Sequence, residues 1–387
     1  MRIKWRGLRN GWGNLRVWIC DKKRLKVAIF GTRKNRNIIP TNKIYMSRIL
    51  VTGGTGFIGS HTVVELQEAG YDVVIVDNLS NSKAEVVDNI EKITGKRPDF
   101  ENFDLSNRGD VLNFFMRHKG SIDAVIHFAA FKAVGESVKK PLEYYRNNLN
   151  SLMNILEGMR YTGVRNLVFS SSCTVYGQPE KLPVTEATPR RPAESPYGNT
   201  KTMNEDIIRD YCAAEPEING LALRYFNPIG AHPSSLIGES PVGVPNNLVP
   251  YITQTAAGLR KELSIFGDDY DTPDGTPIRD YIDVVDLSKA HVVAIRRLLE
   301  GKNKSNYEFF NIGTGKGLSV LELVNAFKKA TGAALPYKIV GRRAGDIVKI
   351  WADTTLANTE LGWKAEVPIE ETLLNAWNWE KKCRGIK

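Results

Sequence analysis

The 387-residue sequence has only four cysteines, which are Cys20, Cys173, Cys212 and Cys383, and no two of them form a CxxC pair. This scarcity excludes a disulfide scaffold and a cysteine-rich zinc site, and it fits a reducing compartment such as the cytoplasm. The sequence also lacks any run of about 18 apolar residues, the length that a membrane-spanning helix needs. Its five histidines form no cluster with carboxylates. We therefore expect a cytoplasmic protein without a membrane segment or a metal site.

Acidic residues are almost absent from the first 46 residues, which contain 13 Lys and Arg and a single acid, Asp21. This segment has a net charge of +12, whereas the whole chain has +10, so the rest of the chain is slightly acidic. If residues 47–387, the body of the chain, were basic, they would suggest a nucleic-acid or membrane partner. Here, however, the basic charge is confined to one end. We expect residues 1–46 to be a basic N-terminal extension, disordered or upstream of a natural start at Met46. We expect no nucleic-acid partner, since RNA binding would depend on this segment alone.

A glycine-rich segment follows the first apolar run of the body. Residues 48–51 predict a short strand, and TGGTGFIG then leads into a helical pattern and a second strand that ends at Asp77. Gly53 permits a tight turn, Gly56 lets the backbone approach a pyrophosphate, and Gly59 allows the helix to pack closely on the strand. The pyrophosphate would bind at the positive N-terminus of the helix. The Asp77 carboxylate would accept hydrogen bonds from a ribose and repel a 2′-phosphate, so the pattern predicts a site for NAD.

Strands and helices alternate along the first half of the body. Apolar strands that alternate with helices predict a parallel sheet covered on both faces, which is a Rossmann-type doubly wound α/β fold. After about residue 226, segments rich in proline and glycine predict a smaller C-terminal α/β substrate-binding region. We expect an NAD-binding domain over 47–226 and this region over 227–387, with segments near 278–300 returning to the first domain. Further strands are expected near 99–103, 123–128 and 166–171, and helices near 107–118, 143–161 and 196–214.

Tyr197 and Lys201 lie four residues apart in one of these helices, and therefore on the same face. A free tyrosine has a pKa of about 10, too high for a base at neutral pH. A nearby ammonium and a nicotinamide cation would both favour the phenolate and lower that pKa. A serine at the end of the preceding strand, in residues 170–172, could share the proton. This pattern predicts proton transfer at a substrate hydroxyl. The alternative is a pair without a catalytic role, in which an exposed lysine lies beside a half-buried ring.

From Met46 to about Lys382, the sequence resembles the UDP-glucose 4-epimerases (UDP-galactose 4-epimerases) of the extended short-chain dehydrogenase/reductase family. Nine segments carry the resemblance, and only the first 45 residues have no counterpart in the family pattern. The segments are TGGTGFIGSH, VDNLSNS, HFAAFKAVGESV, SSSCTVYG, SPYGNTK, LRYFNPIGAHP, VPNNLVPYI, IRDYIDVVDL and GRRAGD.

The resemblance implies a role for each matching residue. Tyr197 would be the catalytic acid and base, Lys201 its electrostatic partner and Ser172 the third catalytic member. These three would also contact NAD, and Ser172 and Tyr197 would contact the substrate. The other NAD-binding residues would be Gly53, Gly56, Phe57, Ile58, Gly59, Asp77, Asn78, Asp104, Phe128, Ala129, Lys132, Asn147 and Tyr225. The other residues that bind the UDP-hexose would be Asn227, Asn247, Leu248, Phe266, Arg279, Arg343, Asp346 and Ile350.

The implied activity is that of an NAD-dependent isomerase that interconverts UDP-glucose and UDP-galactose. The sugar is oxidised at C4, the 4-keto sugar rotates within the site, and it is reduced on its other face. The resemblance places Ile350 beside the C2 substituent of the sugar, where some members have a larger tyrosine, and so implies activity on UDP-N-acetylglucosamine and UDP-N-acetylgalactosamine. The family also implies a homodimer through helices near 143–161 and 196–214.

A sugar-nucleotide 4,6-dehydratase, or another sugar-nucleotide epimerase of the same family, is the alternative. A dehydratase needs an added acid and base, typically carboxylates directly after the catalytic serine or threonine. Cys173 and Thr174 stand at those positions, which argues against dehydration.

Overall fold

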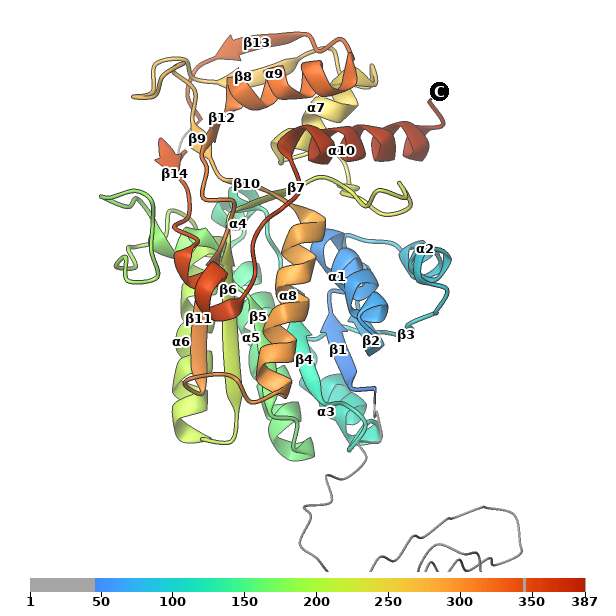
Figure 1. Cartoon of the computed structure of the whole chain (residues 1–387). Helices are drawn as coiled ribbons and strands as arrows, with labels where there is room; N and C mark the ends of the chain where they lie inside the picture. The colour runs from blue at the N-terminus through green and yellow to red at the C-terminus, as the bar shows by residue number, and fades with distance from the viewer. Residues whose placement is uncertain (1–45, 344–345, 387) are drawn as a thin grey trace, which may run out of the picture. The chain divides into compact units, whose positions relative to one another are not determined.

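The computed structural model describes residues 46–343 and 346–386, so the expectation for residues 1–45 lies outside the described residues. Its central sheet has seven parallel strands in the order β11-β6-β5-β4-β1-β2-β3 (Figure 1). These strands are β1 Arg48–Thr52, β2 Asp72–Asp77, β3 Asp99–Asn102, β4 Ala124–His127, β5 Asn166–Ser170, β6 Asn219–Tyr225 and β11 Tyr307–Ile312. The order reverses between β1 and β4, the place where such sheets bind ligands at the carboxyl ends of their strands.

Six helices cover the two faces of this sheet. They are α1 Phe57–Glu68, α2 Glu85–Thr94, α3 Arg108–Arg117, α5 Pro141–Thr162, α6 Pro196–Ala214 and α8 Val284–Leu299. Side chains of a strand alternate between faces, so Ile49 and Val51 lie in one core cluster and Leu50 in the other. The first cluster packs under α1, α2 and α8 and the second under α3, α5 and α6 (Figure 1). Both faces of the sheet are therefore buried.

The Rossmann-type doubly wound α/β fold predicted from the sequence is confirmed by this arrangement. The expected strands near 99–103, 123–128 and 166–171 are β3, β4 and β5, and the expected helices are α3, α5 and α6. The sequence pattern did not predict β6 or β11. Although β11 lies within residues 227–387, it forms the edge of the main sheet, with Phe310 paired to Leu223 of β6.

The remaining elements lie mostly beyond the carboxyl ends of the strands (Figure 1). They are α4 Val134–Lys139, η1 Cys173–Tyr176, β7 Asn227–Ile229, α7 Leu248–Ala256, β8 Leu263–Phe266, β9 Ile278–Arg279, β10 Tyr281–Asp283, β12 Leu318–Ser319, α9 Val320–Thr331, β13 Tyr337–Val340, β14 Lys349–Ile350, η2 Ala357–Leu361 and α10 Ile369–Arg384. A third core cluster joins α7, α9 and α10 to β8 and β10. Among the described helices, none is both long and apolar enough to cross a membrane.

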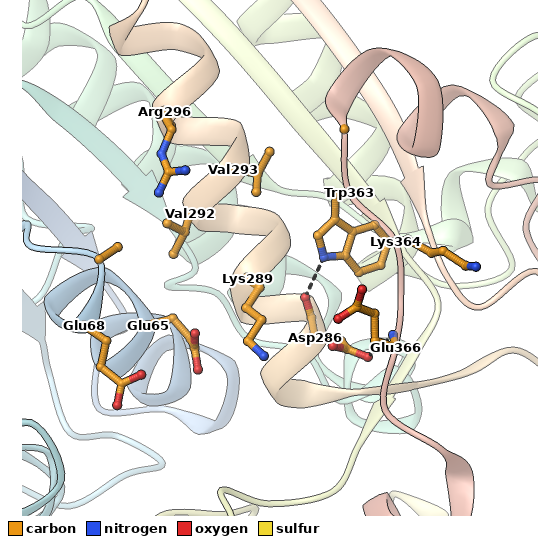
Figure 2. A pocket seen from close by; sticks show the side chains of 12 residues that line it. Glu65, Glu68, Asp286, Lys289, Val292, Val293, Arg296, Trp363, Lys364 and Glu366 are labelled. Atoms are coloured by element: carbon orange, nitrogen blue, oxygen red, sulfur yellow. Dashed lines mark hydrogen bonds between the residues drawn. The ribbon is translucent and has the colours of Figure 1, made fainter.

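Asp286 of α8 fastens the segment before α10 to the main body. One of its carboxylate oxygens, Oδ2, accepts hydrogen bonds from the backbone N–H groups of Glu366 at 2.7 Å and Val367 at 2.8 Å. Its backbone oxygen accepts from the Trp363 indole at 3.0 Å (Figure 2). A cavity of about 460 Å³ lies here between α1, α8 and residues 362–366, with Glu65 and Lys289 among its lining side chains. Asp286, which is 2% exposed, thus holds the C-terminal region on α8.

Replacing Asp286 by alanine should destabilise the fold. Two part-buried N–H groups would lose their acceptor, a loss of about 1–3 kcal/mol in the free energy of unfolding. Asp286→Asn keeps one carbonyl oxygen and should lose less. Thermal or urea unfolding would measure both variants, and equal stability of Asp286→Ala and the unchanged protein would contradict this account.

Candidate active site

The turn between β1 and α1 forms a cradle of bare backbone. Gly53 has φ +70°, and a Cβ atom on it would lie 2.8 Å from the backbone nitrogen of Ala129. A Cβ atom on Gly59 would lie 2.2 Å from the carbonyl oxygen of Gly53. Gly56 caps α1 without a side-chain hydrogen bond, so the first N–H groups of the helix, at Phe57 and Ile58, carry no side-chain cap. Such a helix N-terminus favours a phosphate group, and the cradle fits a dinucleotide.

Asp77 stands at the end of β2, beside this cradle. It is 8% exposed, and its Oδ2 accepts from the N–H of Thr55 at 3.2 Å, while Oδ1 accepts from the N–H of Leu79 at 2.9 Å. Asn78 and Asp104, which the sequence analysis assigned to the same cofactor, come together here through a 3.4 Å hydrogen bond from Asn78 Nδ2 to Asp104 Oδ2. An acid and two further polar groups therefore flank the glycine turn where an adenosine would bind.

The loop after β4 forms the other wall of the cradle. The N–H of Phe128 donates to the Thr52 carbonyl at 3.1 Å, which brings Ala129 against Gly53. Asn147 of α5 donates from Nδ2 to Asn148 Oδ1 at 3.0 Å.

Asn148, which the sequence analysis missed, is 1% exposed. Its Oδ1 accepts from the N–H of Phe131 at 2.8 Å, and its Nδ2 donates to the Thr200 hydroxyl at 3.0 Å. It ties the loop after β4 to α5 and α6.

The first turn of α6 presents Tyr197, with Lys201 one turn further on. The helix begins here because the Ser195 hydroxyl accepts from the N–H of Gly198 at 3.2 Å and proline follows at the first helical position. Lys201 is 3% exposed, and its Nζ lies 5.9 Å from the centre of the Tyr197 ring. Ser172 ends the segment after β5, where its hydroxyl accepts from the N–H of Thr174 at 3.2 Å.

The protein alone does not give Tyr197 the lowered pKa that the sequence analysis expected. Burial raises the pKa of its phenol, and Tyr225 and Cys173 nearby add to this rise, whereas the Ser172 side chain opposes it. Burial lowers the pKa of Lys201 to about 7, although the negative charge of Glu205 acts to raise it. The ammonium donates to the Ser170 carbonyl at 2.6 Å rather than to the phenol, so the phenolate lacks a direct cationic partner among these groups.

Tyr225 ends β6 next to these residues, and its hydroxyl shares a hydrogen bond with that of Ser170. Burial raises the pKa of Tyr225 to about 12, so this phenol stays neutral. It forms a hydrogen-bonded wall of the site rather than a second base.

Among the residues assigned to the sugar nucleotide, three lie close together. Phe266 ends β8 with 40% exposure, and the Arg343 guanidinium lies 5.7 Å from the centre of its ring. Arg343 also pairs with Asp346, with 2.7 Å between Nη2 and Oδ1. Burial raises the pKa of Tyr281 to about 12. The positive charge of Arg279, in β9, acts to lower this pKa, and the negative charge of Asp346 acts to raise it.

Glu239, a residue that the sequence analysis missed, contacts two of the assigned residues. Its Oε1 accepts from Asn247 Nδ2 at 2.6 Å and lies 3.3 Å from the Nζ of Lys132. Asn247 caps α7, and Leu248 is the first residue of that helix. Asn227 begins β7, where its N–H donates to the Asp280 carbonyl at 3.0 Å. Glu239 thus joins a residue assigned to the cofactor with one assigned to the substrate.

Ile350 is 2% exposed and belongs to a core cluster with Val175, Tyr176, Val184, Phe226 and Ala352. β14 pairs with β9, so that Ile350 is the partner of Arg279. Its side chain therefore packs behind η1, the turn that follows Ser172.

No three His, Cys, Asp or Glu side chains gather as a metal site within residues 46–343 and 346–386. The cavity in Figure 2 is lined by none of the residues that the sequence analysis assigned to cofactor or substrate.

Comparisons with known proteins show what this chain is similar to. Residues 50–375 match the model of a family described as GDP-mannose 4,6 dehydratase. A UDP-glucose 4-epimerase from Mus musculus is 49% identical over 343 residues, which cover 87% of this chain and 97% of that protein.

Two solved structures are similar as well. A UDP-glucose 4-epimerase from Stenotrophomonas maltophila, with bound NAD and formylated UDP-arabinopyranose, has a TM-score of 0.84 at 47% identity and covers 88% of this chain and 100% of its own. That from Bifidobacterium longum, in complex with NAD+ and UDP, has a TM-score of 0.83 at 47% identity and the same two coverages.

Gly59→Ala should abolish retention of a dinucleotide, because the new Cβ would overlap the Gly53 carbonyl and force the cradle apart. Overpacking of this kind also costs about 1–3 kcal/mol of stability. Gly135→Ala in α4 is the matched control, since its Cβ would meet nothing within 4 Å. The measurement is bound nicotinamide per protein after purification, and normal retention by Gly59→Ala would show that the cradle does not hold the cofactor.

Proposed function

This chain belongs to the UDP-glucose 4-epimerase family, and we propose how its residues carry out the reaction of that family. It is an NAD-dependent isomerase that interconverts UDP-glucose and UDP-galactose. The sugar loses hydride from C4, turns over as the 4-keto sugar and regains hydride on its other face. A Cβ atom on Gly53 would collide with the backbone of Ala129, and one on Gly59 with the Gly53 carbonyl. This close-packed, bare turn beside Asp77 is the observation that most directly supports the proposal.

The cofactor is NAD, and the chemistry that it supplies when bound is acceptance and return of one hydride. In our proposal Gly53, Gly56, Phe57, Ile58 and Gly59 hold its pyrophosphate. Asp77, Asn78 and Asp104 hold the adenosine, and the negative charge of Asp77 disfavours a 2′-phosphate. The remaining part of the NAD site would be lined by Phe128, Ala129, Lys132, Asn147 and Tyr225.

We propose that Tyr197 removes the proton of the 4-hydroxyl group of the sugar and returns it after rotation. Its pKa, raised by burial in the protein alone, must fall for this role, so a positive charge has to approach the ring. Lys201, with its pKa lowered to about 7, would be redirected from the Ser170 carbonyl toward this site. The Ser172 hydroxyl, which acts to lower the pKa of Tyr197, would relay or orient the proton.

The UDP group would be held by residues from the smaller region. Arg279 and Arg343 would neutralise the diphosphate through forked hydrogen bonds. The exposed ring of Phe266 offers a flat apolar face to the uracil, with Leu248 beside the base and Asn227, Asn247 and Asp346 as polar partners. Anchoring the diphosphate leaves the hexose free to turn, as the reaction requires.

Dehydration at C5 and C6 of the sugar has less support. It needs an added acid and base near Ser172, but Thr174 has no ionisable group. Burial raises the pKa of the neighbouring Cys173 thiol to about 12. Such a thiol cannot serve as a base at neutral pH.

We further propose that the protein acts in the cytoplasm as a homodimer without a nucleic-acid partner. Large apolar side chains on the outer surfaces of α5 and α6 support the dimer, because exposed apolar patches favour association. They include Met153, Tyr161 and Met203, each at least 40% exposed.

The proposed function is tested by incubating the purified protein with UDP-galactose and no added NAD. Formation of UDP-glucose would support it. Absence of product from protein that carries NAD would overturn it.

Tyr197→Phe should lower kcat by about 10²–10⁴-fold, because it removes the acid and base but keeps the ring. NAD should remain bound, and the melting temperature should stay close to that of the unchanged protein. Steady-state kinetics would measure the effect, and turnover near the original rate would rule out the assignment.

Ile350 should permit turnover of UDP-N-acetylglucosamine as well as UDP-glucose. Comparing kcat/KM for both substrates in the unchanged protein and in Ile350→Tyr measures this. We expect the variant to lower the ratio of N-acetyl to plain substrate by about 10–200-fold. If Ile350→Tyr lowers kcat/KM equally for both substrates, or if the unchanged protein does not turn over the N-acetyl sugar, Ile350 acts only in the core cluster.

A further inference from the structure

The carboxylate of Glu205 is the centre of a buried hydrogen-bond network on α6. Glu205 lies one turn beyond Lys201 and two beyond Tyr197, on the same helix face. Its Oε1 accepts from the Ser171 hydroxyl at 2.5 Å and from Nε of Arg224 at 2.8 Å, and its Oε2 accepts from Nη2 of Arg224 at 2.6 Å. One carboxylate therefore joins α6 to the segment after β5 and to β6.

Stability alone is a weak reason for this arrangement. Glu205 and Arg224 are 1% and 4% exposed. Removing two such charges from water is costly, and well-packed apolar side chains of similar volume often stabilise a core equally well or better. Paired, charge-assisted hydrogen bonds instead provide a fixed geometry.

The same network holds the chain on both sides of Ser172. Ser171 precedes Ser172 directly, and η1 follows it and ends at Tyr176. The Tyr176 hydroxyl accepts from Nη1 of Arg224 at 3.0 Å and donates to Asn311 Oδ1 at 2.6 Å. Tyr176 and Asn311 are both fully buried. The position of Ser172 is thus fixed from two directions by groups bonded to Arg224 and Glu205.

We propose that Glu205 is a positioning residue for the reaction: its carboxylate fixes the segment that carries Ser172 against the face of α6 that carries Tyr197 and Lys201. This inference rests on the proposed function. The N–H of Ser171 donates to the Leu223 carbonyl at 3.0 Å, so the main chain is already attached to β6. The bond from the Ser171 hydroxyl to Glu205 adds the link to α6. Without that link, the Ser172 hydroxyl and the Tyr197 phenol can shift relative to each other.

The chain offers a second buried pair as a control. Arg297 of α8 and Glu308 of β11 form a forked pair, with 2.8 Å from Nε to Oε2 and 3.0 Å from Nη2 to Oε1. Their side chains are 9% and 10% exposed. This pair matches Glu205 and Arg224 in chemistry, but it joins elements that carry neither Ser172 nor Tyr197.

The experiment compares Glu205→Gln, Ser171→Ala and Glu308→Gln with the unchanged protein that carries its NAD. For each we would measure kcat, the KM for UDP-galactose, bound NAD and the melting temperature. Misplacing reacting groups by about 1 Å can cost up to 10²-fold in rate, so we expect Glu205→Gln to lower kcat by about 10-fold or more. Ser171→Ala should lower kcat by a smaller factor. KM and bound NAD should stay unchanged in both, and Glu308→Gln should lower the melting temperature but not kcat.

Unchanged kcat in both Glu205→Gln and Ser171→Ala would overturn the proposal, as would an equal loss of kcat in Glu308→Gln. If Glu205→Gln fails to fold, Ser171→Ala decides, because it removes one hydroxyl and leaves the buried pair intact. The proposed function fails separately: it is wrong if the unchanged protein does not epimerise UDP-galactose. It stands if that protein is active and Tyr197→Phe is not, whatever the result for Glu205.

Discussion

The parallel pairing of β1 with β2 and β4 determines where the loops of the site come together. In parallel strands, all carboxyl ends meet at one edge of the sheet, so the glycine turn, Asp77, the loop after β4 and the segment with Ser172 come together there. This arrangement requires both sheet faces to be buried, which explains the continuous apolar runs in the strands. The close contact of Gly59 with the Gly53 carbonyl then lets α1 begin directly at this edge.

The sequence was most informative where a local pattern determines the structure. The strand, glycine turn and helix from β1 to α1 combine in one short segment, and the helices α3, α5 and α6 follow their apolar periodicity. β11 was missed because an edge strand far along the chain pairs with β6 through tertiary contacts that no local pattern encodes. The sequence analysis did not identify Glu205 and Arg224, since no local pattern reveals that two charges 19 positions apart are buried together.

The electrostatics of the site explain why its chemistry needs a complete assembly. Burial raises the pKa of Tyr197 and lowers that of Lys201, so each group is driven toward its neutral form. Such a pair becomes reactive when bound ligands add charge and exclude water. A neutral resting phenol beside a lysine bonded to Ser170 is consistent with an enzyme that begins proton transfer only after substrate and cofactor are both in place.

In the proposed reaction, hydride leaves C4 of the sugar and returns to the same carbon without release. The most direct measurement uses UDP-galactose that carries deuterium at C4, incubated with the purified protein in ordinary water without added NAD. We expect UDP-glucose with the deuterium still at C4. Product that contains hydrogen from the solvent at C4 would contradict it, because the epimerisation would then proceed through loss of a proton from carbon.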